Sequence, residues 1–420
     1  MISPSTPKIA IIGSGIAGLS AAHFLEKQFD VSLFEKNDRL GGHTNTVNVL
    51  ENNNEIAIDT GFIVMNNKNY PNFANLLEEL DIPLFDSNMS FGYHDHDSNL
   101  QYSGSGINGI FAQRKNIFNL NFHILIKEIF RFYKQAKIDL SENCINIDES
   151  LNDYLKRYNF NYRFIDHHLI PMGSAIWSTP YKDMLNFPAQ NFLNFFNNHG
   201  LLSLKERPKW KTITGGSSTY IKKMIASWKN VKIITNVKIE NIKRCNHKIN
   251  IYTKKEMKTF DHVILAVHAD QVLKLLGDAN IEEENTFNSW KYSKSKTFLH
   301  TDSRVMPSEK KVWSSWNFSR ITNNKTFLTY YMNMLQPLKT SIDYFVSLNP
   351  PYRPDNILYE IDYSHPIFSK QSIDSRLMLK EINGNKNTWF TGSYVNNGFH
   401  EDAVSSSIEV SSKIKRLYEV

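Results

Sequence analysis

The sequence predicts an α/β fold of two or three domains that opens with a Rossmann-type, three-layer nucleotide-binding unit. Residues 9–12 form a short apolar run, typical of a strand buried on both faces, and a glycine-rich turn, a helix-forming segment and a second apolar run at 31–34 follow in order. The chain has 420 residues, too many for one compact unit. Hydrophobic residues make up 41% and charged residues 21%, which supplies a sizeable core.

The glycine-rich turn has the spacing of a dinucleotide-binding motif. Gly13 permits the tight turn, Gly15 lets a pyrophosphate approach the backbone, and Gly18 lets the helix pack closely on the strand. The helix N-terminus offers free amides to the phosphates, and Glu35, at the end of the second strand, can accept hydrogen bonds from a ribose. A bare glycine turn is the alternative, but the ordered strand, turn, helix, strand and acid favour nucleotide binding. The predicted contacts are Gly13, Ser14, Gly15, Ile16, Ala17, Gly18, Glu35 and Lys36.

A second glycine doublet follows in residues 38–43. A simple NAD-binding unit does not need it, whereas it would let the backbone pass close to a larger cofactor, and Arg39 could reach a phosphate. A plain turn between strands is the alternative. After the first motif, the doublet favours FAD, with Arg39, Gly41, Gly42 and His43 as further contacts.

The chain resembles the flavin-containing amine oxidase and phytoene desaturase superfamily. Within it, the chain is similar to a bacterial NAD/FAD-binding oxidoreductase subgroup often encoded beside cyclopropane-fatty-acyl-phospholipid synthase. The residues that carry this resemblance are 38–47, 58–73, 102–114, 169–180, 195–210, 213–221 and 392–404. The resemblance implies a two-lobed flavoprotein whose FAD domain is assembled from residues 1–72, 205–275 and 385–420. A helical segment (73–204) and a β-rich segment (276–384) then form a mixed α+β substrate lobe.

The resemblance also implies site residues outside the first motif. By this resemblance, residues 59–62 approach the flavin, although Gly61 could equally be a turn glycine. The backbone of Val237 is expected to contact the adenine. The segment after Gly392, with a helix that begins near Glu401, serves the ribityl-pyrophosphate part. These contacts are Thr60, Gly61, Phe62, Val237, Ala266, Gly392, Ser393, Gly398, His400 and Glu401. Because neither cysteine lies in an attachment motif, non-covalent FAD is expected.

Amine oxidases commonly place a lysine on a strand of the substrate lobe, where it holds a water near flavin N5. The resemblance therefore makes Lys296 the candidate catalytic residue, with a solvent-facing strand lysine as the alternative. The segment GFHED near the C-terminus stands where amine oxidases usually carry a flavin-flanking tyrosine. That difference puts amine oxidation in doubt.

Between these motifs the pattern predicts a hairpin at 44–66, helices at 71–82, 116–137 and 148–165, an aromatic loop at 171–180, and a three-stranded meander between 231 and 260. The aromatic residues Trp177, Phe187, Phe192, Phe195 and Phe196 could line an apolar tunnel or form ordinary core. Helix 116–137 carries Lys127, Arg131, Lys134 and Lys137 on its polar side. A core-facing helix with a solvated basic face is favoured over one lying on a membrane.

Bulk properties exclude several classes of function. The net charge of +6 and a pI of about 8.9 are mild for this size, so nucleic acid is not implied. The two cysteines lie far apart, the adjacent His167 and His168 point different ways, and no metal site is expected. With no apolar leader or span of about 20 residues, we expect a cytoplasmic protein, with peripheral contact at the inner membrane left open.

Together these features predict an FAD-dependent oxidoreductase that acts on a lipid or acyl chain, desaturating or isomerising it by hydride transfer to flavin N5. A flavin amine oxidase and a non-catalytic FAD-binding partner of a lipid-modifying methyltransferase are the alternatives. The substrate would be an apolar or acyl small molecule. The sequence does not define the electron acceptor or the oligomeric state.

Overall fold

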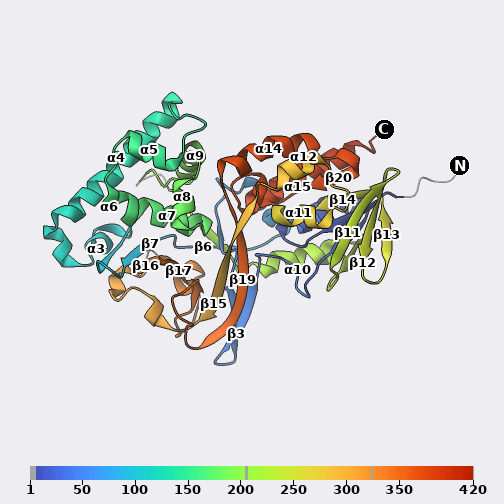
Figure 1. The fold of residues 1–420 in the computed structure, drawn as a ribbon. Coiled ribbons are helices and arrows are strands. Elements are labelled where there is room, and N and C mark those ends of the chain that lie inside the picture. Colours follow the sequence, from blue (N-terminus) through green and yellow to red (C-terminus); the bar gives the residue numbers. More distant parts are fainter. Residues whose placement is uncertain (1–5, 204–206, 323–324, 420) are drawn as a thin grey trace.

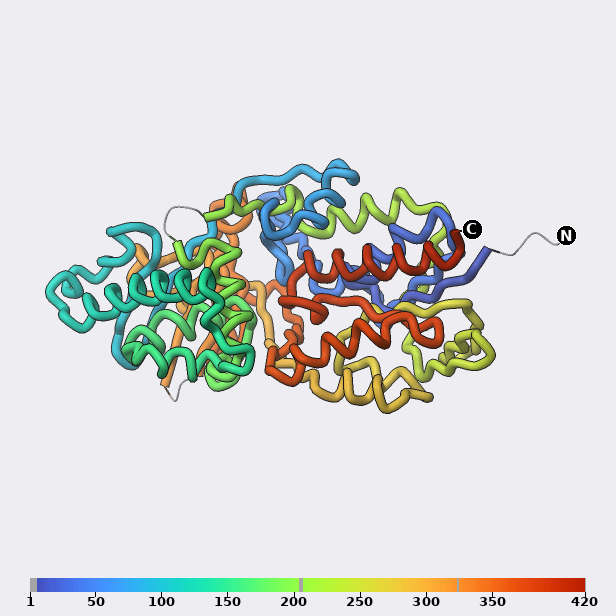
Figure 2. Tube along the Cα trace, turned by 90° about the horizontal axis from the view of Figure 1, so that it is seen from above, coloured from blue at the N-terminus to red at the C-terminus, as the bar shows by residue number. Residues whose placement is uncertain are grey.

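The computed structural model describes residues 6–203, 207–322 and 325–419. Two lobes lie side by side along an elongated molecule, and the long strands β15 (Lys291–His300) and β19 (Ile357–Ile367) run between them (Figure 1). Seen from above, the N- and C-terminal segments lie together in one lobe, and residues from about 100 to 200 form the far end of the other (Figure 2).

The first lobe is built on a five-stranded parallel sheet with the order β10-β2-β1-β14-β20. Ile9 pairs with Val31 on one side and with His262 on the other. The central strands are almost continuously apolar because both faces of the sheet are covered. The strands are β1 (Lys8–Ile12), β2 (Asp30–Phe34), β10 (Val231–Ile234), β14 (His262–Leu265) and β20 (Thr388–Phe390).

Helices cover one face of this sheet. Ile9, Ile11 and Leu33 are fully buried against them, and Ser407 ties two of these helices by donating to the Ala17 carbonyl at 2.8 Å. The helices are α1 (Ile16–Leu25), α2 (Pro71–Glu79), α10 (Ser218–Ser227) and α15 (His400–Arg416).

On the other face, Ala10 and Ile12 share a core with an antiparallel meander and three helices. These are β11 (Ile239–Cys245), β12 (Lys248–Thr253), β13 (Met257–Phe260), α11 (Ala269–Leu275), α12 (Ile281–Phe287) and α14 (Lys370–Ile382). The three-layer nucleotide-binding architecture is confirmed.

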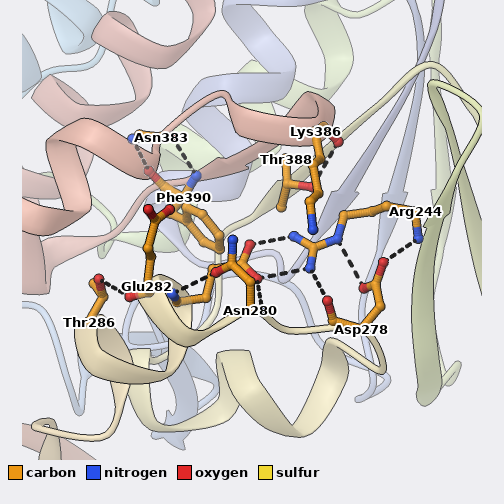
Figure 3. A network of polar contacts seen from close by, with 10 residues as sticks. Arg244, Asp278, Asn280, Glu282, Thr286, Asn383, Lys386, Thr388 and Phe390 are labelled. Atoms are coloured by element: carbon orange, nitrogen blue, oxygen red, sulfur yellow. Dashed lines mark hydrogen bonds and ion pairs between the residues drawn. The ribbon is translucent and has the colours of Figure 1, made fainter.

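A buried arginine fixes the meander to the neighbouring helical segment (Figure 3). Arg244 donates from Nε to Asp278 at 3.0 Å and from Nη2 to Glu283 at 2.9 Å, and its side chain is almost completely buried. Asn280 and Glu283 form a capping box at the start of α12. Because both carboxylates face one guanidinium, the network orients β11 and α12 through bidentate geometry.

The second lobe contains a seven-stranded mixed sheet, β19-β15-β18-β17-β16-β7-β8, in which only β16 and β7 are parallel among the described pairs. Its further strands are β7 (Phe91–Asp95), β8 (Leu100–Ser103), β16 (Trp316–Ile321), β17 (Lys325–Tyr331) and β18 (Phe345–Leu348). Its helices are α3 (Gly106–Ile110), α4 (Leu120–Glu142), α5 (Leu151–Arg157), α6 (Tyr162–Phe164), α7 (Ile170–Trp177), α8 (Tyr181–Leu185), α9 (Ala189–Asn198) and α13 (Met332–Leu335).

Smaller elements complete the fold. The expected hairpin is present as β3 (Thr46–Glu51) and β4 (Asn54–Asp59), and β5 (Val64–Met65), β9 (Lys211–Ile213) and β6 (Leu84–Asp86) form a short sheet. Single helical turns are η1 (Arg114–Phe118), η3 (Ser303–Val305), η4 (Lys310–Val312), η6 (Asn385–Asn387) and η7 (Ser393–Val395).

Two local expectations were wrong, and a third needs a new starting residue. The loop expected at 171–180 is mostly helix α7, which tolerates Pro171 because the His167 carbonyl that the proline cannot bond accepts from the Tyr102 hydroxyl at 2.7 Å. The helix expected at 148–165 ends at Arg157, and His167 and His168 lie in the π-helical turn η2 (Ile165–Leu169) that leads into α7. The expected three-stranded meander is present, but it starts at Ile239, since β10 joins the parallel sheet.

The predicted boundary at residue 205 lies outside the described residues, and the five segment bounds stay predictions. In the parts of the chain that the structure describes, no helix has both the length and the apolar character required to cross a bilayer.

Candidate active-site cavity

A single continuous cavity of about 1240 Å³ extends from the parallel sheet of the first lobe into the helices of the second. This exceeds the usual size of a small-ligand pocket, about 300–1,000 Å³. At one end its walls are the β1–α1 turn, the end of β2 and the glycine doublet; at the other they are α4 and α7. The cavity therefore has room for a dinucleotide together with a second molecule.

The first glycine motif is built as its spacing predicts. Gly13 has φ +101°, and a Cβ there would lie 2.5 Å from the Ala266 carbonyl oxygen. A Cβ on Gly18 would lie 1.9 Å from the Gly13 carbonyl oxygen, so the helix packs directly on the turn. A Cβ on Gly15 would meet no atom within 4 Å and would project into open space. Of the three, only Gly15 leaves room for a ligand at the N-terminus of α1.

Glu35 is buried at the end of β2 and lines the cavity. Its Oε2 accepts hydrogen bonds from the Ser14 amide at 3.1 Å and hydroxyl at 2.7 Å. Its Oε1 accepts from the Asn37 amide at 2.9 Å and side chain at 3.0 Å. The carboxylate thus braces the glycine turn and still borders the space expected for the ribose. Lys36 lines the same region.

Arg39 supports the second glycine doublet from within the chain. It donates to the carbonyl oxygens of Thr44 at 2.9 Å and Gly42 at 2.8 Å. Gly41 forms a bridge with Gly15, and a Cβ on Gly42 would lie 3.2 Å from the Gly15 Cα. The two glycine motifs therefore form one surface of the cavity.

A cluster of histidines that we did not predict as a unit lies in the cavity wall beyond the doublet. His43 stacks on Tyr363 with ring centroids 4.9 Å apart, and lies 5.2 Å from His365 and 6.0 Å from His268. Burial, with repulsion from His268 and Arg39, lowers the pKa of His43 to about 3. Burial, with His43 nearby, lowers the pKa of His365 to about 3. Burial, with Lys36 and His365 nearby, lowers the pKa of His268 to about 4. All three rings are neutral at pH 7.

Several polar atoms in this wall have no partner among the described residues. They are His43 Nε2, His365 Nδ1 and the Tyr394 hydroxyl, and all three side chains line the cavity. Buried polar atoms are normally hydrogen-bonded, so these three fit a polar ring system bound between the lobes.

The C-terminal segment closes this part of the cavity. Gly392, Ser393, Gly398 and His400 line it. His400 stacks on Phe62 with centroids 3.7 Å apart and bonds Thr44 Oγ1 at 3.0 Å. Burial, with His43 nearby, lowers the pKa of His400 to about 3. A Cβ on Gly61 would lie 2.1 Å from the His43 carbonyl oxygen, so the position requires a glycine.

Four predicted site residues have other roles or positions. Glu401 points away from the cavity and accepts from the amides of Asn72 and Phe73 at the start of α2, at 3.1 and 2.9 Å. Thr60 Oγ1 bonds the Tyr363 hydroxyl at 2.9 Å instead of lining the cavity. Gly18 acts only in packing.

The fourth is Lys296, which lies on an exposed face of β15 and pairs with Glu360 at 2.8 Å, outside the cavity lining. This position does not favour the flavin-side role that the resemblance implied. Val237 and Ala266 do line the cavity, but the Val237 amide donates to the Glu35 carbonyl at 3.0 Å, which leaves only its carbonyl for an adenine.

The far half of the cavity is apolar, but most of the aromatic residues expected there are core. Of the five aromatic residues expected there, only Phe195 lines the cavity. The other four pack on one another in the core: Trp177, Phe187, Phe192 and Phe196. The apolar wall comes instead from two helices and the seven-stranded sheet: Phe122, Leu125, Ile126, Ile129, Phe130, Tyr133, Met172, Ala175, Ile176, Trp316 and Tyr330. Sequence periodicity alone could not separate these side chains from the core because α4 is apolar over much of its circumference.

Two polar groups stand in this apolar half. His168 has its Nε2 unpartnered among the described residues, and burial, with Arg207 nearby, lowers its pKa to about 3. Arg207 lines the cavity and donates from Nε to the Ser203 carbonyl at 3.1 Å. A positive charge therefore borders an otherwise apolar chamber.

A glycine-rich turn at the carboxyl ends of a parallel sheet, opening into a cavity shared with a second lobe, defines a dinucleotide-binding protein of the two-lobed flavoprotein class. A family model for flavin-containing amine oxidoreductases matches residues 16–340. Since this match covers more than half of the chain, the protein belongs to that family. The predicted oxidoreductase class and FAD cofactor are thereby confirmed.

Solved structures share the fold over almost the whole chain. A cyclohexylamine oxidase from Brevibacterium oxydans IH-35A is 13% identical, with 99% of this chain and 100% of that chain covered and a TM-score of 0.70. A CLA-producing fatty acid isomerase from P. acnes is 15% identical, with both chains fully covered and a TM-score of 0.68. Putrescine oxidase bound to putrescine is 13% identical, with 98% and 99% covered and a TM-score of 0.66. No curated protein sequence matches this chain.

Within the described residues, no group of three or more His, Cys, Asp or Glu side chains is arranged to hold a metal ion. Cys144 and Cys245 are exposed free thiols.

Proposed function

We propose that the protein oxidises or isomerises a long acyl chain, with the chain bound in the apolar half of the cavity and FAD bound in the polar half. The observation that carries this proposal is the continuity of the two halves. A chain lying between α4 and α7 would point directly at the histidine-lined wall.

When bound, FAD would supply a hydride-accepting centre: desaturation would also release a proton from the acyl chain and need an external electron acceptor, whereas isomerisation would be redox-neutral overall. Gly15 and the N-terminus of α1 would hold the pyrophosphate, and Glu35 the ribose. His43, His365 and Tyr394 would offer their unpartnered polar atoms to the isoalloxazine ring.

The remaining roles belong to the second lobe. Ile126, Ile129 and Met172 would exclude water and align the chain. Arg207, beside the unpartnered His168, would bind a carboxylate or phosphate at the polar end of the substrate. The fatty acid isomerase with the same fold supports this substrate class by analogy only.

Amine oxidation is the second candidate, because the family and two of the similar structures carry that name. The neutral histidines and the apolar chamber favour the acyl chain over a small polar amine.

The two substrates can be separated by anaerobic titration of the FAD-loaded protein with fatty acids of increasing length and with a panel of amines. Each added methylene that enters the chamber contributes about 0.8 kcal/mol, so affinity should rise roughly fourfold per CH₂. Bleaching of the flavin by amines, with no response to any acyl chain, would replace the acyl proposal with amine oxidation.

A pair of variants locates the binding chamber. Ile129→Trp should fill the space between α4 and α7 and abolish the chain-length dependence, while FAD stays bound. Leu140→Trp is the matched control, since Leu140 lies on the same helix, half-buried and outside the cavity lining. Equal chain-length dependence in both variants would show that the chain binds elsewhere.

A further inference from the structure

The end of the second lobe most distant from the parallel sheet exposes an unusual set of large apolar side chains. Phe118 is 87% exposed, and Ile107 and Leu120 are each 78% exposed. We call this surface the α4 apex; it consists of Ile107, Ile117, Phe118, Leu120, Ile124 and Phe130. Figure 1 places α3 and α4 at this outer end. Large exposed apolar side chains gathered at one end of a lobe mark an interaction site.

The exposed charges within the apex's own segment of the chain have one sign. The exposed side chains Arg114, Lys115, Lys127, Lys134 and Lys137 belong to the same segment. The single acid in residues 105–137 is Glu128, which is buried and held by Arg131 through hydrogen bonds of 2.9 and 2.6 Å. Arg131 is therefore paired within the fold, whereas the five other cations are exposed; of these, Arg114 also donates to the Phe111 carbonyl at 2.8 Å.

The apex is ordered by contacts within the lobe. Asn119 caps α4 by accepting from the Asn121 amide at 3.0 Å. His123 bonds the Ile117 carbonyl at 2.7 Å, and Phe111 packs edge-to-face on Phe122. The apolar side chains are thus held outward by capped and bonded elements.

The apex also adjoins the cavity. Phe130 is half exposed and lines the cavity at the same time, and Ile126, Ile129 and Tyr133 continue the lining inward along α4. Phe130 is therefore shared between the apex and the apolar half of the cavity.

We propose that the α4 apex docks on an anionic phospholipid bilayer and that acyl chains enter the cavity from the membrane beside Phe130. A helix that presents Phe, Leu and Ile with flanking lysines lies in the plane of the interface, and the exposed cations match anionic headgroups. The route for the substrate rests on the proposed function, whereas docking itself does not. The apex, rather than the polar face of α4 alone, is the surface that contacts the lipid.

The test is flotation of FAD-loaded protein with vesicles of phosphatidylcholine alone and of phosphatidylcholine mixed with phosphatidylglycerol. Wild-type protein should float with the mixed vesicles and much less with the neutral ones. The double variant Phe118→Ser/Leu120→Ser should reduce binding by about tenfold or more. The double variant Leu377→Ser/Ile281→Ser removes two apolar side chains of similar exposure from the first lobe and should float as wild type does.

Equal flotation of the two double variants, or no flotation of wild type, would overturn docking. If wild type instead sediments as a dimer that Phe118→Ser/Leu120→Ser converts to a monomer, the apex is an interface between copies and the proposal is wrong. Acyl titration of the flavin in vesicle-free solution reports the proposed function separately. A flavin response without vesicle binding refutes docking alone, and vesicle binding without a flavin response refutes the acyl substrate alone.

Discussion

Gly15 and Gly18 belong to one motif but should respond to substitution in opposite ways. Gly15 has φ −64° and ψ 175°, which alanine adopts freely, and its new methyl group would meet no atom within 4 Å. Gly15→Ala should therefore leave the free protein folded, or stabilise it by about 0.4–1 kcal/mol through the unfolded chain. The methyl group would occupy the space expected for the pyrophosphate, so FAD affinity should fall by roughly tenfold or more, that is, at least about 1.4 kcal/mol.

Gly18→Ala should instead destabilise the free protein. Its methyl group would lie 1.9 Å from the Gly13 carbonyl oxygen, so α1 must move away from β1 at a cost of about 1–3 kcal/mol or more. Urea unfolding of apoprotein and fluorescence titration with FAD measure the two effects independently. Unchanged FAD affinity in Gly15→Ala would refute the assignment of this turn as the pyrophosphate site, and wild-type stability in Gly18→Ala would refute the packing argument.

Three further predictions concern the first lobe. Glu35→Ala should weaken FAD binding by roughly tenfold or more through loss of a charge-assisted hydrogen bond to ribose. Glu26 is also a buried glutamate, but it accepts the Asn230 amide outside the cavity, so the control Glu26→Ala should lower stability only. Equal FAD affinity in both variants would exclude the ribose contact. Because burial lowers the pKa of His365 to about 3, the native state holds fewer protons than the unfolded chain between that value and about 6.5. Apoprotein stability should fall on acidification through this window and fall less steeply in His365→Asn, and a midpoint independent of pH would contradict the burial of a neutral ring. Arg244→Ala should destabilise by about 3–5 kcal/mol in urea because it leaves the buried Glu283 carboxylate without its cation. A loss as small as that of an exposed ion pair would show that the network is not buried in solution.

The cofactor-binding half could be predicted from the sequence because its signals are local. Strand, turn, helix and acid follow one another within residues 8–35, and each conformation is dictated by near neighbours. The doublet at Gly41 and Gly42 lies next to Gly15 in the structure for the same reason, since a short connection leaves few alternatives. Of the positions taken from family resemblance alone, some line the cavity and others do not. Glu401 caps α2 and Lys296 pairs with Glu360, because neither role depends on a recognisable local pattern.

The sequence by itself therefore determined the fold class, the nucleotide-binding turn and the flavin cofactor. Only the tertiary structure decided which side chains face the cavity. His43, His268 and His365 meet there because β14 and β19 bring residues more than 300 positions apart to the same wall, and no spacing in the chain encodes that distance. Likewise, apolar residues follow one another closely along α4, so periodicity could not tell that Phe132 lies in the core, that Ile129 lines the cavity and that Phe130 lines it while half exposed. Packing against neighbouring elements assigns each of those directions, and packing is a property of the assembled molecule.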